Sequence, residues 1–185
     1  RTLDDMVHHG SHNVLCVECG GPRPGSGCAG RGIIAAFQEL DRLDAIDTYK
    51  PDIIIYDVLG DVVCGGFSMP MRKGYADKIF VITSGENMAI HAAANIAVAL
   101  EGFKDRGYAS LGGIILNHRD VKNEDAKVAE LAEDIHSAVI GELSRSETVT
   151  DAEDLGKTVI EVFPDSAMAE EYRSLARTIM DICRE

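Results

Sequence analysis

Two cysteines lie in loops that are rich in glycine, a setting typical of metal or cluster ligands. Cys28 stands near the end of the loop from Gly20 to Gly32, directly before an expected helix. Glycine allows backbone N–H groups to come close to a ligand, and the N-terminus of a helix favours thiolate over thiol. Cys64 lies in a second loop, 57–70, and is also followed by glycines. Both thiols are therefore candidate ligands.

The second loop also contains a candidate magnesium site. Asp57 follows the apolar segment 53–56. In P-loop NTPases, the carboxylate of an Asp at the end of an apolar strand helps to hold Mg²⁺. Cys64 comes seven residues after this carboxylate. Such a spacing would connect a metal site on Cys64 to the state of a bound nucleotide.

The number of thiols suggests a dimer. A 4Fe–4S cluster generally takes four thiolates, and Cys28 and Cys64 supply two. A two-fold homodimer would place both cysteines of each subunit around one shared cluster on its axis. The alternative is that both are buried free cysteines in turns, because cysteine is among the most buried residue types.

The three further cysteines are not expected to be cluster ligands. Cys16 and Cys19 form a C-x-x-C pair on or near an expected strand, where residues three apart point to opposite faces. We expect Cys16 to be a buried core thiol and Cys19 to lie near the cluster loop. Cys183 has no second ligand nearby in the sequence, so we expect a structural or incidental role.

Composition narrows the class of protein. The 185 residues carry 31 acidic and 18 basic side chains, a formal net charge of -13, which argues against nucleic acid as a general partner. No apolar run approaches the ~20 residues that span a bilayer, and the first residues lack the pattern of a signal peptide. We expect a cytoplasmic protein with no membrane partner and with one domain over 1–185.

Apolar runs and amphipathic runs alternate along the chain. Val/Ile-rich runs predict strands at 13–18, 53–59, 78–84, 113–117, 138–143 and 158–163, and helical patterns cover 32–43, 87–103, 124–137 and 166–183. This alternation predicts an α/β fold with a mainly parallel sheet flanked by helices. Ligands in such folds bind at the carboxyl ends of the strands.

Three segments, GGPRPGSGCAGRG, YDVLGDVVCGGFSMPMR and SGENMAIHAAANI, closely resemble the nitrogenase iron protein family. The resemblance extends from about Val14 to Leu175. It implies a P-loop NTPase-like fold and a homodimer with one 4Fe–4S cluster held by Cys28 and Cys64. Arg31 would lie on the surface that docks the electron acceptor, and in some members it is the site of ADP-ribosylation.

The resemblance also implies residues around MgATP. Asp57 would hold the Mg²⁺ through water, Asp61 would orient or activate the attacking water, and Asn117 would contact adenine. The residues implied around the base and ribose are Arg145, Glu153 and Tyr172.

Two departures from the family pattern concern the nucleotide. The family's GKGGIGKS-type P-loop does not occur in these 185 residues, so we expect weak or absent ATP binding by these residues alone and interpret the sequence as a fragment or as one preceded by further residues. The family's Pro-Arg-Asp reads here Ser144-Arg145-Ser146.

The resemblance implies an ATP-dependent electron donor, an oxidoreductase that passes low-potential electrons to a larger nitrogenase or nitrogenase-like catalytic component. One alternative is a component of an archaeal-type tetrapyrrole reductase, and another is a cluster-binding remnant without ATPase activity. A cluster-free partitioning ATPase of the same broad fold is a third, although it would not need the two cysteine loops.

Overall fold

The computed structural model describes residues 1–19, 29–60, 68–72, 74–103 and 107–184. These residues form two compact units, Arg1–Tyr75 and Ala76–Glu185. The expectation of one domain over 1–185 stays a prediction.

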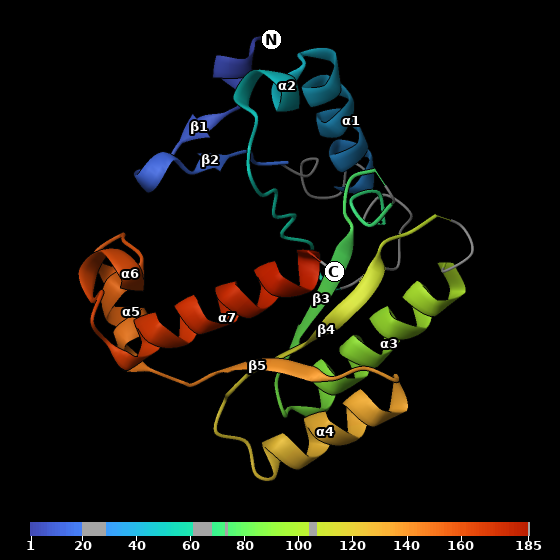
Figure 1. Cartoon of the computed structure of the whole chain (residues 1–185), viewed down its shortest axis with the longest axis vertical. Helices are drawn as coiled ribbons and strands as arrows, with labels where there is room; N and C mark the ends of the chain where they lie inside the picture. The colour runs from blue at the N-terminus through green and yellow to red at the C-terminus, as the bar shows by residue number, and fades with distance from the viewer. Residues whose placement is uncertain (20–28, 61–67, 73, 104–106, 185) are drawn as a thin grey trace. The chain divides into compact units, whose positions relative to one another are not determined.

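The first unit contains mostly short elements. Two 3₁₀ turns, η1 (Leu3–Asp5) and η2 (Ser11–Asn13), flank the two-residue strand β1 (His8–His9), which pairs antiparallel with β2 (Leu15–Cys16). Helix α1 (Ala29–Arg42) is followed by α2 (Ala45–Tyr49) (Figure 1). The apolar periodicity over 32–43 thus correctly predicted a helix.

An aromatic group forms the centre of the first unit. Phe37 on α1 is buried, stacks on Tyr56 with ring centroids 5.3 Å apart and meets Tyr75 edge-on at 4.8 Å. The Tyr75 hydroxyl donates to Asp41 Oδ2 at 3.2 Å. These contacts attach α1 to the segments that follow it.

The second unit is built on a parallel sheet in the order β3–β4–β5. The strands are β3 (Lys78–Thr83), β4 (Ser110–Asn117) and β5 (Val139–Leu143), and α3 (Asn87–Phe103) and α4 (Glu124–Asp134) make the two crossovers. Parallel strands buried on both faces carry continuous apolar runs, and Ile114, Ile115 and Leu116 on β4 are almost fully buried. The predicted α/β fold with a parallel sheet is confirmed.

Helices cover the sheet on two sides. Helices α3 and α4 pack on it through a core made of Val81, Ala93, Ile114, Leu116, Val128, Leu131 and Ala132. Figure 1 shows α7 (Ala167–Arg184) on the opposite side of the strands. Gly141 on β5 permits this approach, because a Cβ there would lie 2.7 Å from Leu175 Cδ1 on α7.

A smaller core joins the last three helices. Helices α5 (Glu147–Asp154) and α6 (Val159–Val162) pack with α7 around Ala152, Val159, Met168 and Ala169. The predicted helix over 166–183 is confirmed by α7. Helix α5 was not expected from the apolar pattern.

Two predicted strands are wrong. Residues 53–59 have no regular secondary structure, and four of their apolar side chains are exposed: Ile53, Ile54, Ile55 and Leu59. A strand needs a neighbour for its backbone hydrogen bonds, and no strand among the described residues pairs with this run.

Residues 158–163 contain helix α6 in place of the predicted strand. The reason is a capping box at its start. Thr158 Oγ1 accepts from the backbone N–H of Glu161 at 3.3 Å, and the Glu161 carboxylate accepts from the backbone N–H of Thr158 at 2.9 Å.

The prediction over 13–18 holds only in part. The strand there is confined to Leu15–Cys16 and its ladder is antiparallel. Cys16 is exposed, so the expectation of a buried core thiol is wrong. The reason is that strands of only two residues bury little: both residues of β1 and Cys16 of β2 are exposed. Cys19 and Cys183 are exposed as well.

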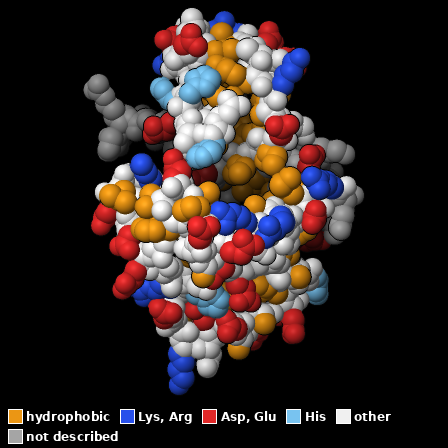
Figure 2. Space-filling view, turned by 60° about the vertical axis from the view of Figure 1, so that its left-hand side comes forward, with side chains coloured by type: hydrophobic (Ala, Val, Ile, Leu, Met, Phe, Trp, Pro, Cys, Tyr) orange, Lys and Arg blue, Asp and Glu red, His pale blue; other side chains and the backbone are white. Residues whose placement is uncertain are grey.

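On one face of the molecule, the acidic side chains are spread out and do not gather in one patch (Figure 2). This distribution fits a solvated surface. No helix in the described parts of the chain is long and apolar enough to cross a membrane.

Candidate functional site: the carboxyl edge of the sheet

The carboxyl ends of β4 and β5 bring two predicted nucleotide contacts to one edge. Asn117 is the last residue of β4 and is paired in register with Leu143, the last residue of β5. The N–H of His118 donates to the carbonyl of Leu143 at 2.9 Å, which extends the pairing by one step. Asn117 is exposed. Arg145, two residues beyond β5, is also exposed, and its Nη1 lies 3.5 Å from Asp120 Oδ2.

The two serines that flank Arg145 have structural partners. Ser144 donates from its backbone N–H and its hydroxyl to the Glu171 carboxylate, at 2.7 and 2.9 Å. Ser146 is the N-cap of α5, and its hydroxyl accepts from the N–H of Thr148 at 3.2 Å. Serine is a preferred N-cap, as is the aspartate of the family pattern. The Ser-Arg-Ser variant therefore keeps the start of α5 and attaches the loop to α7.

Helices α5 and α7 carry the other two residues expected near the nucleotide. Tyr172 on α7 follows Glu171 and packs, half-buried, against the core around Ala152. Glu153 on α5 is exposed. The ring of Tyr172 thus contributes to packing, and the Glu153 carboxylate is open to solvent.

One buried carboxylate organises this edge. Glu124, the first residue of α4, is 5% exposed and accepts from three groups. The backbone N–H of Gly85 lies 3.1 Å from its Oε1, the N–H of Arg119 lies 2.9 Å from the same atom, and His118 Nδ1 lies 3.0 Å from its Oε2. Glu124 thereby ties the turn after β3 to the loop after β4.

The titration of these groups reflects the same contacts. Burial by itself would raise the pKa of Glu124, but the backbone hydrogen bonds from Arg119 and Gly85, with that of His118, lower its pKa to about 2. Desolvation works to lower the pKa of His118, yet its hydrogen bonds to Glu124 and Glu142 outweigh this and raise the pKa above the ordinary value. Glu124 is therefore ionised at neutral pH.

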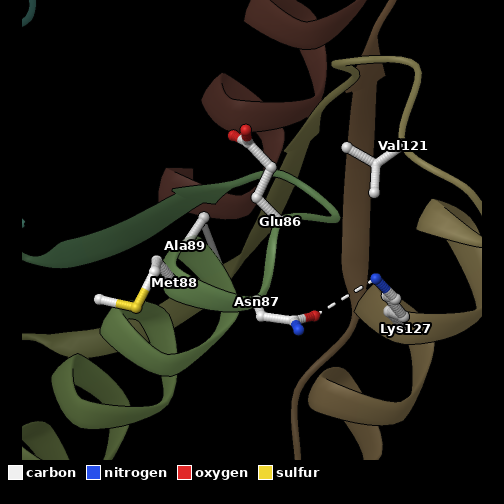
Figure 3. A pocket seen from close by; sticks show the side chains of 6 residues that line it. All are labelled: Glu86, Asn87, Met88, Ala89, Val121 and Lys127. Atoms are coloured by element: carbon white, nitrogen blue, oxygen red, sulfur yellow. Dashed lines mark hydrogen bonds between the residues drawn. The ribbon is translucent and has the colours of Figure 1, made fainter.

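A lysine on α4 holds the same turn from its other side. Lys127 Nζ donates to the carbonyl oxygen of Gly85 at 3.1 Å and to Asn87 Oδ1 at 3.3 Å (Figure 3). A Cβ on Gly85 would lie 2.7 Å from Glu124 Cα, so only glycine fits between the turn and α4.

This turn borders an open pocket of about 440 Å³. The start of α3 lines one side of it, and Lys127 on α4 points toward Asn87 (Figure 3). The pocket is lined by Glu86, Asn87, Met88, Ala89, Val121 and Lys127. Lys127 supplies a cation at its edge.

The first unit holds two predicted residues. Arg31 lies in the first turn of α1 and is exposed. Asp57 is exposed in the irregular segment that follows α2. Cys28, Cys64 and Asp61, the expected cluster ligands and water-orienting carboxylate, lie outside the described residues.

The sequence analysis missed Glu124, Lys127 and His118 as organising residues. A signal existed for the first: an acidic residue at the start of an amphipathic run, shortly after a strand that ends in Asn, is favourably placed at a helix N-terminus. No local signal marks Lys127, because its partners Gly85 and Asn87 lie about 40 positions away in the chain.

Comparison with known proteins gives the family. Residues 2–184 match the family described as 4Fe-4S iron sulfur cluster binding proteins, NifH/frxC family. The nitrogenase iron protein of Methanospirillum hungatei JF-1 is 52% identical over 181 residues, 97% of this chain and 64% of the relative. That of Methanococcus voltae is 46% identical over 179 residues, again 97% and 64%. The chain thus spans somewhat less than two thirds of these relatives.

Solved structures agree on the fold. A ParA family ATPase from Chlorobium tepidum TLS superposes with a TM-score of 0.63 at 17% identity, covering 96% of this chain and 67% of that one. The cell division ATPase MinD of Pyrococcus furiosus gives 0.58 at 15% identity, covering 83% and 59%. The P-loop NTPase-like α/β fold is thereby confirmed. From its match over residues 2–184 and these identities, this chain belongs to the NifH/frxC family of 4Fe–4S cluster-binding proteins.

Proposed function

We propose that this chain is the cluster-carrying part of an ATP-dependent electron donor that works as a homodimer. The observation that carries the proposal is the family match over residues 2–184, which includes both cysteine loops. Cys28 and Cys64 of two subunits would hold one 4Fe–4S cluster between them. The cluster would supply one-electron transfer at low potential.

The nucleotide part of the proposal rests on the carboxyl edge of the sheet. Ligands of parallel α/β sheets bind there, and Asn117 and Arg145 both lie exposed at that edge. An Asn amide can donate to and accept from the edge of a base. Glu153 and Tyr172 would complete the surroundings of base and ribose, while Asp57 would hold Mg²⁺ through water and Asp61 would orient the attacking water.

The electron acceptor would be the larger catalytic component of a nitrogenase, docked on a surface that includes Arg31. Both relatives quoted above are named nitrogenase iron proteins, which favours this acceptor over a tetrapyrrole reductase. Arg31 is exposed in the first turn of α1, three positions after Cys28 in the sequence. A docking residue needs this accessibility.

The first experiment is anaerobic reconstitution followed by iron and sulfide analysis and EPR of the dithionite-reduced protein. Wild type should contain about four irons per dimer, and Cys28→Ala or Cys64→Ala should lose them. Cys183→Ala is the matched control, because Cys183 is an exposed thiol near the end of α7. Iron-free wild type after reconstitution, or equal loss in the control, would overturn the cluster assignment.

A second measurement separates the electron donor from a cluster-binding remnant. Because these 185 residues contain no P-loop, titration with MgADP at millimolar concentration should detect weak binding in wild type and weaker binding still in Asn117→Ala and Arg145→Ala. Arg173→Ala, an arginine on α7 paired with Glu170, should behave as wild type. An absence of nucleotide binding with an intact cluster would contradict the nucleotide contacts proposed for Asn117 and Arg145 and would leave only the cluster-binding role.

A further inference from the structure

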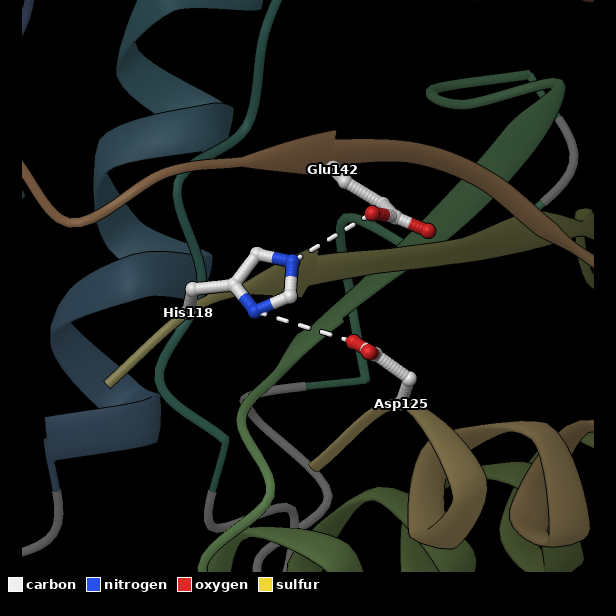
Figure 4. A group of neighbouring side chains, drawn as sticks. All are labelled: His118, Asp125 and Glu142. Carbon is white, nitrogen blue, oxygen red and sulfur yellow. Dashed lines mark hydrogen bonds and ion pairs between the residues drawn. The ribbon is translucent and has the colours of Figure 1, made fainter. Parts of the chain in front are cut away.

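Beside Asn117 lies a group of side chains for which neither the cluster nor the nucleotide accounts. His118 follows β4, Glu142 is on β5 and Asp125 is in the first turn of α4. His118 Nε2 lies 3.3 Å from Glu142 Oε2, and Nδ1 lies 3.8 Å from Asp125 Oδ1. Figure 4 shows the two carboxylates on either side of the imidazole ring. These three residues are the strand-end cluster.

A fourth residue orients the imidazole. The buried carboxylate of Glu124 lies 3.0 Å from His118 Nδ1 and is itself fixed by the N–H groups of Gly85 and Arg119. An ionised carboxylate accepts hydrogen bonds only, so it favours the ring form with a proton on Nδ1. The lone pair of Nε2 then faces Glu142. Histidines that bind metals commonly have such a carboxylate behind the ring.

Positive charge is scarce around the strand-end cluster. Three carboxylates, those of Glu124, Asp125 and Glu142, contact one imidazole. No Lys or Arg within the described ranges forms an ion pair with any of them. The helix N-terminus explains Asp125, but it does not explain Glu142, which comes from a strand. A cation between Nε2 and Glu142 would take the place of the proton that otherwise joins these two atoms.

The distances suit a metal ion. Bonds of about 2.0–2.1 Å in a tetrahedral site place neighbouring ligand atoms about 3.3 Å apart, and the separation between His118 Nε2 and Glu142 Oε2 is 3.3 Å. One ligand atom from each of the three residues lies within 4.8 Å of the others. Asp125 contacts the ring at Nδ1, so its side chain, which is 80% exposed, would have to turn to reach an ion on Nε2.

We propose that His118, Asp125 and Glu142 form a binding site for a divalent first-row transition-metal ion. One imidazole and two carboxylates suit Mn²⁺, Fe²⁺ or Zn²⁺, with water in the remaining positions. The side chain of Glu142 is 60% exposed, which leaves the ion a path from solvent. The bound ion would join β4, β5 and α4 beside Asn117, and this role is independent of the cluster and of the nucleotide.

Mn²⁺ is the appropriate probe, because thiolates prefer softer ions and the five cysteines of this chain would compete for Zn²⁺. The protein is freed of metal with chelator and titrated with Mn²⁺, and the EPR signal of free Mn²⁺ measures binding. Wild type should bind about one ion per chain. His118→Ala and Glu142→Gln should bind at least ten-fold more weakly. Mn²⁺ should also broaden the His118 ring resonances in NMR before those of the other histidines.

Two variants serve as matched controls. His136→Ala removes a histidine, and Glu130→Gln a carboxylate, both exposed and in or directly after α4. Each should bind Mn²⁺ as wild type does, and the circular dichroism of every variant should match that of wild type. Equal weakening in control and cluster variants would mean adventitious binding only. No Mn²⁺ binding in wild type would overturn the proposal and leave a protonated His118 as the bridge between the carboxylates.

Discussion

The carboxylate of Glu124 accepts a hydrogen bond from the backbone N–H of Gly85 at 3.1 Å. Lys127, one turn further along α4, donates a hydrogen bond to the carbonyl oxygen of the same residue, also at 3.1 Å. Both polar groups of one peptide position are thus bound by side chains from a single helix. This double contact fixes the turn after β3 against α4 and lines up the edge of the sheet where Asn117 ends β4.

We expect Glu124→Gln to lower the free energy of unfolding of the second unit by about 2 kcal/mol. Hydrogen bonds to a charged acceptor are lost, and the buried NH2 group of Gln would face donors where the carboxylate accepted. Denaturant unfolding followed by circular dichroism measures the change. Glu130→Gln, on the exposed side of the same helix, should leave stability within about 0.5 kcal/mol of wild type. Similar losses in the two variants would contradict the special role of Glu124.

The stabilising effect of Glu124 should depend on pH. Its pKa is about 2 in the folded chain and 4.5 ordinarily, so the ionised form favours folding. The contribution is fully present above pH 4.5 and should be lost as the pH falls toward 2. Unfolding measured through this window should show the stability difference between wild type and Glu124→Gln shrinking at acid pH. A difference that stays constant would disprove the link.

Two glycines should differ in their tolerance of alanine. At Gly85 the new Cβ would meet Glu124 Cα at 2.7 Å, and a backbone atom cannot move aside cheaply. At Gly141 it would meet Leu175 Cδ1 at 2.7 Å, the end of a flexible side chain. We expect Gly85→Ala to cost about 1–3 kcal/mol of unfolding free energy and Gly141→Ala clearly less. Thermal melts compare the two, and the reverse order would contradict the packing described for α4.

Ser146 should matter as a helix cap. Ser146→Ala removes the acceptor for the N–H of Thr148 and should destabilise α5 by about 1 kcal/mol. Ser146→Asp, which restores the residue of the family pattern, should keep the stability of wild type. Hydrogen exchange at the Thr148 amide should report the change locally. An unchanged exchange rate in Ser146→Ala would show that the cap is unimportant.

The local pattern of the chain was sufficient for most elements of the second unit. The runs at 78–84, 113–117 and 138–143 became β3, β4 and β5, and the long helices were found near their observed bounds. Apolar periodicity works here because these elements bury the faces that the pattern marks. It failed at 158–163, where the capping box of Thr158 and Glu161 outweighs a short apolar run. It failed also at 53–59, where a strand would need a partner that the run itself does not specify.

The sequence by itself determined the family, because two cysteines in glycine-rich loops form a pattern that local spacing preserves. It also placed Asn117 and Arg145 at the carboxyl ends of strands. Only the tertiary structure decided which side chains meet at that edge. Glu124 and Lys127 form hydrogen bonds with the backbone of Gly85, and His118 lies between Asp125 and Glu142. The physical reason is that these contacts join residues on separate strands and helices, and their meeting depends on the register of the sheet and the packing of α4.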